Sequence, residues 1–215
     1  MEKYDYAIIP HNKTGGVVVW VVNDQTVDGS ESGTSFRQAL YAMECGFKLH
    51  DTMIWDKSAV TFPDSNRYLP SFEYMFVFSK GAPKTFNPLK DRPNIWAGTK
   101  AHGTWRQKDG TLKGKTNKQQ VFEEFGIRFN VWKIPGEKHN TTGHPAVFPL
   151  RLAKDHILSW SNEGDLIFDP FLGSGTTRIA AYDTNRRFIG CEISKEYFEN
   201  QERRFKEYTA QTRMF

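Results

Sequence analysis

Apolar runs alternate along this chain with stretches of helical periodicity. Val17 to Asn23 is a continuous, β-branched run, which predicts a strand covered on both faces, as in a parallel sheet. Other apolar runs predict strands at Asp51 to Trp55, Tyr74 to Ser79, Phe129 to Ile134, Asp165 to Phe168 and Phe188 to Gly190. Because helical patterns separate these strands, we expect an α/β fold with a Rossmann-like, doubly wound, mostly parallel sheet.

The helical stretches have apolar stripes at a spacing of three to four residues. Ser35 is expected to cap a helix that ends near Gly46 and has Phe36, Ala39, Leu40 and Met43 on one face. Further helices are expected at Gln119 to Phe125, at Ala146 to Trp160 with Pro149 in its first turn, from Arg178, and from Ser194. The last helix places Tyr197, Gln201, Phe205 and Tyr208 on one side.

The segment from Lys80 to Lys118 interrupts this pattern. It holds five glycines, three prolines and little periodicity, and so long an irregular stretch usually marks a functional insertion. Its ten Lys and Arg outnumber Asp91 and Asp109 by eight, so the rest of the chain, with 19 basic and 23 acidic residues, carries −4 of the total charge of +4. The segment therefore favours a surface that faces a polyanion, although a solvated basic loop without a partner has the same composition.

Length and composition narrow the class of protein. A chain of 215 residues can bury a sizeable core, and no run approaches the roughly 18 apolar residues of a membrane span. The first residues lack the order of a secretion signal, so we expect a cytoplasmic protein. Cys45, near a helix end, and Cys191, in a predicted buried strand, are interpreted as reduced core thiols. His139 and His144 have no cysteine partner at metal-ligand spacing, so no metal site is expected.

The strongest candidate for chemistry is a loop of small residues between a predicted strand and a predicted helix, Asp169-Pro170-Phe171-Leu172-Gly173-Ser174-Gly175-Thr176-Thr177. Small residues let a ligand approach the backbone, and the N–H groups at a helix start favour anionic groups. Glu192 follows 17 positions after Gly175, close to the offset of about 20 at which an acid meets ribose hydroxyls in nucleotide-binding βαβ units. The pattern predicts a site for a nucleoside cofactor.

Five segments, in this order, resemble the DNA amino-methyltransferases that use S-adenosylmethionine, in their β-type motif order. They are Gly15 to Asp24, Phe72 to Lys80, His144 to Pro149, Asp169 to Gly175 and Phe188 to Ile193. In that order the target-recognition region separates the catalytic half from the cofactor half. The resemblance implies a catalytic half at residues 1–79, a target-recognition insertion at 80–128 and a cofactor half at 129–215.

The resemblance also implies roles for the loop residues. Glu192 would accept hydrogen bonds from the ribose. The alternative is that it is an acid at the start of a helix, stabilised only by the helix dipole. Phe171 would pack on the adenosyl group or belong to the core, and Asp169 would lie near the cofactor's ammonium. Ser174, Thr176 and Thr177 would bond the methionine carboxylate or cap the helix. Gly173 and Gly175 would let the cofactor approach, and His144 would border its methionine end.

Double-stranded DNA is the partner that the resemblance implies, with the target base flipped out of the stack. The phosphate contacts are expected from Lys84, Lys90, Arg92, Lys100, Arg106, Lys108, Lys113 and Lys115. Trp96 and Trp105 would stack or wedge against bases, or anchor a small subdomain.

One motif of the family is missing from this sequence. The family's catalytic loop is an acid, amide or serine followed by Pro-Pro and an aromatic residue, and the chain contains no Pro-Pro dipeptide. We therefore expect weak or absent catalysis, and no catalytic residue is assigned. The segment Tyr4 to Ile9 is either a stub of the catalytic strand or the end of the helix that follows it. The central strand that carries this loop in the family would be supplied by another chain or be replaced by the N-terminal segment. The third alternative is that the product is truncated.

Three functions remain open at this point. The first is transfer of a methyl group to an exocyclic amino nitrogen of DNA, with cytosine N4 favoured over adenine N6 on overall resemblance. The second is an incomplete remnant or partner subunit, in a homodimer or with a complementing chain, that binds the cofactor or DNA. The third, a nucleotide-dependent oxidoreductase, is disfavoured because Asp169-Pro170-Phe171 replaces the first glycine of the G-x-G-x-x-G fingerprint.

Overall fold

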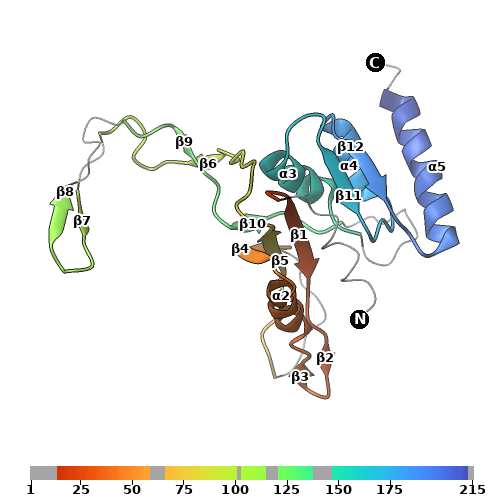
Figure 1. The fold of residues 1–215 in the computed structure, drawn as a ribbon, viewed down its shortest axis with the longest axis horizontal. Coiled ribbons are helices and arrows are strands. Elements are labelled where there is room, and N and C mark those ends of the chain that lie inside the picture. Colours follow the sequence, from red (N-terminus) through yellow and green to blue (C-terminus); the bar gives the residue numbers. More distant parts are fainter. Residues whose placement is uncertain (1–13, 59–65, 101–102, 115–120, 138–146, 213–215) are drawn as a thin grey trace. The chain divides into compact units, whose positions relative to one another are not determined.

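The computed structural model describes residues 14–58, 66–100, 103–114, 121–137 and 147–212, apart from the side chain of Trp105. The chain divides into two compact units, one made of Met1–Asn87 and Asn130–Phe215 and the other of Pro88–Phe129 (Figure 1). The segment Tyr4 to Ile9 and the residues Lys115, His139 and His144 lie outside the described residues. None of the described helices is long and apolar enough to cross a membrane.

A four-stranded mixed sheet forms the first part of the larger unit. Its spatial order is β1 (Val17–Val22), β5 (Phe72–Ser79), β4 (Lys48–Asp56) and β10 (Val131–Lys133). Strands β1 and β4 are antiparallel to β5, and only β10 runs parallel to its neighbour β4. The α/β class is confirmed. The parallel surroundings expected for the run from Val17 are wrong, because an apolar run reports burial, whereas the chain connections decide the direction of the neighbouring strand.

Helix α2 (Thr34–Glu44) packs on this sheet through Ala39, which joins Phe47, Phe76 and Phe78 in one buried cluster. The prediction that Ser35 caps this helix is wrong. The N-cap is Gly33, and the Ser35 N–H instead donates to Asp24 Oδ1 at 3.1 Å. Burial alone would raise the pKa of Asp24, but hydrogen bonds led by Ser32 and Ser35 lower it below its usual value. The expected apolar face is also wrong in part, since Phe36, Leu40 and Met43 are exposed.

The second part of the larger unit is a parallel strand pair covered by helices. Strand β11 (Leu166–Asp169) pairs with β12 (Arg187–Gly190), and Ile167 and Phe188 pack on a cluster formed by α3 (Leu150–Trp160) and α4 (Thr176–Asp183). Helix α5 (Lys195–Thr212) follows β12. Helix α3 begins at Leu150 rather than at Ala146, because its N-cap Pro149 is extended, with ψ 139°.

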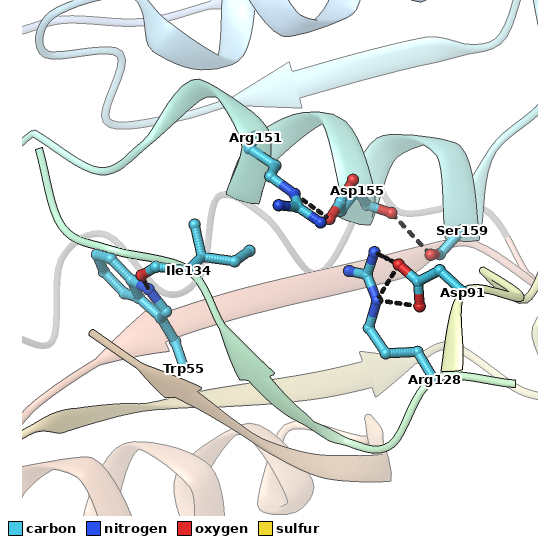
Figure 2. A network of polar contacts seen from close by, with 7 residues as sticks. All are labelled: Trp55, Asp91, Arg128, Ile134, Arg151, Asp155 and Ser159. Carbon is cyan, nitrogen blue, oxygen red and sulfur yellow. Dashed lines mark hydrogen bonds and ion pairs between the residues drawn. The ribbon is translucent and has the colours of Figure 1, made fainter. Parts of the chain in front are cut away.

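Each part of the larger unit has its own polar contacts, and side chains of α3 join the two parts. Beside the mixed sheet the Trp55 indole donates to the Ile134 carbonyl at 2.7 Å, and within α3 the Ser159 hydroxyl donates to the Asp155 carbonyl at 2.7 Å (Figure 2). Buried His156 of α3 stacks on Trp132 of β10 with ring centroids 4.4 Å apart, and its Nε2 lies 3.1 Å from Met75 Sδ. Helix α3 is therefore fixed to the mixed sheet on one side and to α4 on the other.

The smaller unit consists of short strand pairs. Strand β6 (Arg92–Pro93) pairs with β9 (Phe125–Gly126), and β7 (Thr104–Arg106) pairs with β8 (Leu112–Gly114). Within this unit Arg128 forms an ion pair with Asp91 (Figure 2), and the Arg92 guanidinium lies 4.7 Å from the ring centre of Phe129. The helix expected at Gln119 to Phe125 is wrong over the described residues, since Val121 bridges to Lys100 and Phe125 lies in β9.

A further two-stranded hairpin, β2 (Thr26–Val27) with β3 (Ser30–Glu31), belongs to the larger unit.

Candidate cofactor site

The glycine-rich loop after β11 is fixed to the end of β12 by backbone hydrogen bonds. The Leu172 N–H donates to the Cys191 carbonyl at 2.9 Å, and the Cys191 N–H donates to the Asp169 carbonyl at 2.9 Å. Cys191 therefore follows β12 and is exposed, so its expected place in a buried strand is wrong, and Cys45 is only half-buried, so neither cysteine is the core thiol expected. The loop lies at the carboxyl ends of two parallel strands, where α/β sheets bind ligands.

Two glycines give the loop its path. Gly173 has φ 50° and Gly175 has φ 77°, in the left-handed region that side chains other than glycine disfavour. A Cβ on Gly175 would lie 3.0 Å from Gln201 Cβ, so the fully buried Gln201 of α5 packs directly against the loop. The N-cap of α4 is Gly175, which has no side chain, so the hydroxyl cap expected from Ser174, Thr176 or Thr177 is wrong.

Glu192 is brought to the loop as the spacing predicted. Its Oε2 accepts the Gly173 N–H at 2.8 Å, and its Oε1 accepts the Ser194 N–H at 2.9 Å. The carboxylate thus joins the glycine loop to the segment just before α5. If Glu192 served only to interact with the dipole of α5, its hydrogen bond to Gly173, 19 residues earlier in the chain, would have no explanation.

Hydroxyl groups and a cation gather at the other end of the loop. Ser174 Oγ lies 3.1 Å from Oγ1 of Thr176, which is fully buried, and Thr177 beside it is half-buried. Arg204 of α5 donates from Nη1 to the Ser174 carbonyl at 2.7 Å and to Thr176 Oγ1 at 3.2 Å. Burial lowers the pKa of the Arg204 guanidinium from its usual value, and the attraction of Glu137 opposes this shift. The first turn of α4 contains no acidic residue, so this end suits an anionic group.

Phe171 lies at the surface of the loop. Its side chain is 52% exposed, which contradicts a core role, and its ring meets Trp20 of β1 edge-on with centroids 5.9 Å apart. The Phe171 N–H donates to Asp169 Oδ1 at 3.0 Å, so Asp169 shapes the first turn of the loop. Trp20 is itself oriented by a hydrogen bond of 2.9 Å from its indole to Gln38. An exposed, oriented aromatic ring beside a loop of small residues suits a flat heterocycle.

Sequence reasoning missed Arg204 and Gln201 as parts of this site. The sequence places Gln201 on one side of the last helix, but its contact with Gly175 lies 26 residues away along the chain. Arg204 belongs to a helix with many charged residues, and its contacts with Ser174 and Thr176 depend on how that helix docks. The periodic signal that could have found it is its position three residues after Gln201, on the same side of the helix, whereas Arg203 is on another side and exposed.

The basic residues predicted to contact DNA are not all available. Lys84 belongs to the larger unit, where its side chain packs against Gly15. Lys90 forms an ion pair of 2.7 Å with Glu123, and Arg92 donates to the Ile127 carbonyl at 3.0 Å. The remaining described residues of the set are all exposed, namely Lys100, Arg106, Lys108 and Lys113. Trp96 is 67% exposed, so it does not anchor a subdomain core.

Comparison with known proteins gives this geometry a family context. Residues 6–203 match the DNA methylase family described as N6_N4_Mtase. The orphan methyltransferase M.BamHII of Bacillus amyloliquefaciens is 57% identical over 204 residues, which cover 91% of this chain and 77% of that protein.

Two solved structures are similar in fold. M1.HpyAVI, in a complex with S-adenosylmethionine, has a TM-score of 0.64 at 23% identity and covers 95% of this chain. The PvuII DNA methyltransferase, described as cytosine-N4-specific, has a TM-score of 0.65 at 21% identity and covers 90% of this chain. The chain spans 81% of the M1.HpyAVI chain and 64% of the PvuII chain, and less than half of several other curated relatives.

Proposed function

The chain belongs to the DNA methylase family N6_N4_Mtase, an S-adenosylmethionine-dependent family, and we propose that the glycine loop after β11 holds S-adenosylmethionine for methyl transfer to DNA. The observation that carries this proposal is the contact of 2.8 Å between Glu192 and the Gly173 N–H, which supports it because an acid beside a glycine loop suits a ribose. We further propose that the acceptor is an exocyclic amino nitrogen of a base in double-stranded DNA.

The residues of the loop suit the three parts of this cofactor. Phe171 would pack on the adenine, since its ring is half exposed and oriented by Trp20. Glu192 would accept the ribose hydroxyls, since its carboxylate contacts the Gly173 N–H of the loop and the Ser194 N–H before α5. The methionine carboxylate would lie at the start of α4, near Ser174, Thr176 and Thr177, where the helix dipole favours an anion. Asp169 would lie on the side of the ammonium, and His144, outside the described residues, would border the methionine end.

When bound, the cofactor supplies a methyl group attached to a positively charged sulfonium. The chain's own contribution to the reaction is to fix the direction of that methyl group by holding adenine, ribose and carboxylate at three points. The amino group of the target base must lose a proton as it gains the methyl group. No residue is assigned to accept that proton, because the sequence has no Pro-Pro motif of the family's catalytic loop.

A methyl-transfer assay on duplex DNA with radiolabelled cofactor tests this function. We expect weak turnover by this chain alone, and in a digest of the DNA the label should be found in N4-methylcytosine rather than N6-methyladenine. Vigorous turnover would contradict the prediction of weak catalysis. Label in N6-methyladenine would contradict the prediction that cytosine N4 is the acceptor. Glu192→Ala should abolish the weak signal, whereas Glu199→Ala, which removes an exposed acid of α5, should preserve it.

The missing Pro-Pro motif favours one second candidate function. In it the chain is a partner subunit that binds the cofactor or DNA and completes its site in a homodimer or with a complementing chain. Cofactor binding without any methyl transfer, followed by transfer once a chain with the catalytic motif is added, would support this candidate. Full activity of the isolated chain would exclude it.

A further inference from the structure

The hairpin of β7 and β8 has its own tight turn and exposes both faces. All side chains described between Gly103 and Gly114 are exposed, and Thr104 pairs with Gly114 while Arg106 pairs with Leu112 (Figure 1). The turn is closed by the Gln107 N–H, which donates to the Thr111 carbonyl at 2.7 Å, and by Asp109, which accepts the Thr111 N–H and hydroxyl at 2.9 and 2.7 Å. The hairpin is therefore shaped without any buried apolar side chain among its described residues.

An isolated two-stranded hairpin is only marginally stable in water, because it buries little apolar surface. The hydrogen bonds described for β7, β8 and their turn all lie within the hairpin, and Leu112 is 63% exposed. A hairpin with so defined a turn and so little packing gains stability when a partner covers one of its faces.

The charge of the hairpin indicates which partner this is. Arg106, Lys108 and Lys113 are exposed, and none of them forms an ion pair with a described residue. Elsewhere in the unit two acids form ion pairs with bases, Asp91 with Arg128 and Glu123 with Lys90.

The one acid of the hairpin is also occupied. Hydrogen bonds from Thr111 lower the pKa of Asp109, whose carboxylate is used within the turn. Its negative charge offsets one of the three bases, so the described hairpin keeps a net charge of +2, and Lys100 of the same unit is exposed as well, which favours a polyanion.

We propose that this hairpin enters the major groove of the DNA duplex and reads base edges there. The major groove is wide enough for a two-stranded β-ribbon, arginine bonds guanine in two places, and glutamine does the same with adenine. Arg106 and Gln107 stand at the turn end of β7, and Leu112, opposite Arg106, lies on the same face of the ribbon, where an apolar side chain can contact a thymine methyl group. Lys108 and Lys113 contact the flanking phosphates. The inference rests on the proposed action on duplex DNA and names the element that recognises the sequence.

Salt dependence tests the phosphate contacts, with a random-sequence 30-base-pair duplex as the probe and the full chain as the protein. Lys108→Ala with Lys113→Ala should reduce the slope of log affinity against log salt by about 2, since each phosphate contact contributes about 0.9. The control is Lys195→Ala with Lys206→Ala, which removes the same charge from exposed positions of α5 and should leave the slope unchanged. Equal slopes for both double variants would overturn the assignment of the hairpin.

Selection from a randomised duplex pool tests the base contacts. The wild-type chain should enrich a defined sequence, and Arg106→Ala should bind that sequence about 10- to 100-fold more weakly and lose selectivity at one or two positions. Methylation of guanine N7, which lies in the major groove, should interfere with binding of the wild type but not with that of Arg106→Ala. Unchanged selectivity together with no N7 interference would overturn groove reading. A folded wild-type chain that binds no duplex at low salt would overturn the proposed function as well, which separates the two failures.

Discussion

We propose two functions for Glu192, one in the structure of the loop and one in binding the cofactor. Its carboxylate accepts backbone N–H groups from Gly173 and Ser194, and so it stabilises the loop before any ligand is bound. The same oxygens face the position proposed for the ribose. A substitution at this residue is therefore expected to change both the stability of the loop and the affinity for the cofactor.

Glu192→Ala should weaken the binding of S-adenosylmethionine by about 1.5–3 kcal/mol, as for hydrogen bonds to a charged group. Glu192→Gln keeps one carbonyl oxygen but places an amide NH₂ against a backbone N–H, so its affinity should lie between those of wild type and Glu192→Ala. Titration calorimetry measures both variants. An affinity of Glu192→Ala equal to that of the wild type would show that the acid does not contact the ribose.

Arg204 is expected to position the end of the loop that receives the methionine carboxylate. Arg204→Met leaves the Ser174 carbonyl and the Thr176 hydroxyl without their charged donor, and should weaken cofactor binding by about 1–3 kcal/mol. Arg204→Lys should restore part of this loss. Because the contact lies at the methionine end, Arg204→Met should affect S-adenosylmethionine more than adenosine. Equal losses for both ligands would indicate a general loss of stability, and Arg203→Met, at the exposed neighbour, is the matched control.

At the scale of elements, one carboxylate joins α3, α4 and α5. Asp183 of α4 accepts the Tyr208 hydroxyl of α5 at 2.7 Å and forms an ion pair of 2.5 Å with Lys154 of α3. Burial, followed by the hydrogen bond to Asp183, raises the pKa of Tyr208 to about 12 from its usual 10.0. Because the folded-state pKa is the higher one, this stabilisation is complete below about pH 10 and is lost as the pH rises to about 12.

Tyr208→Phe should therefore lower the free energy of unfolding by about 1 kcal/mol at neutral pH. The difference from the wild type should shrink between about pH 10 and 12. Denaturant titrations at several pH values measure it, with Tyr68→Phe at a fully exposed residue as the control. A difference that stays constant up to pH 12 would contradict the link to this hydroxyl.

Gly175→Ala tests the docking of α5 on the loop. The substitution imposes a left-handed conformation, φ 77°, on a residue with a Cβ and brings that Cβ to 3.0 Å from Gln201. We expect a loss of about 1–2 kcal/mol in the free energy of unfolding. Gly164→Ala, also at positive φ but with open space around it, should show the conformational cost alone. Equal losses for the two variants would show that the contact with Gln201 contributes nothing.

The helices and strands that were predicted correctly are those whose signals lie in neighbouring residues. The glycine loop lies between β11 and α4 as expected, because two glycines break a strand and open a helix within nine residues. The failures depend on distant residues. Asp24, eleven positions before Ser35, bonds the first turn of α2, and the bonds of the loop to Cys191 fix the end of β12. The helix expected near Val121 is replaced by pairing with Lys100 and Pro93, which no local pattern reports.

At the scale of the whole molecule, the sequence predicted the α/β class but not the directions of the strands. The apolar composition of β1 and β5 fits a buried strand of either direction, and their antiparallel pairing follows from the connections. The basic insertion was predicted from its charge, its irregular composition and its place in the order of motifs. Which of its bases form ion pairs depends on contacts such as those of Lys90 with Glu123 and of Arg128 with Asp91.

The most direct test of the account is calorimetric titration of S-adenosylmethionine into the full chain, with NAD as the comparison ligand. The account predicts one saturable site for S-adenosylmethionine, weakened in Glu192→Ala and in Phe171→Ala, and no binding of NAD. A folded chain that binds no S-adenosylmethionine, or binds it equally well in both variants, would contradict the claim that the loop after β11 holds the methyl donor.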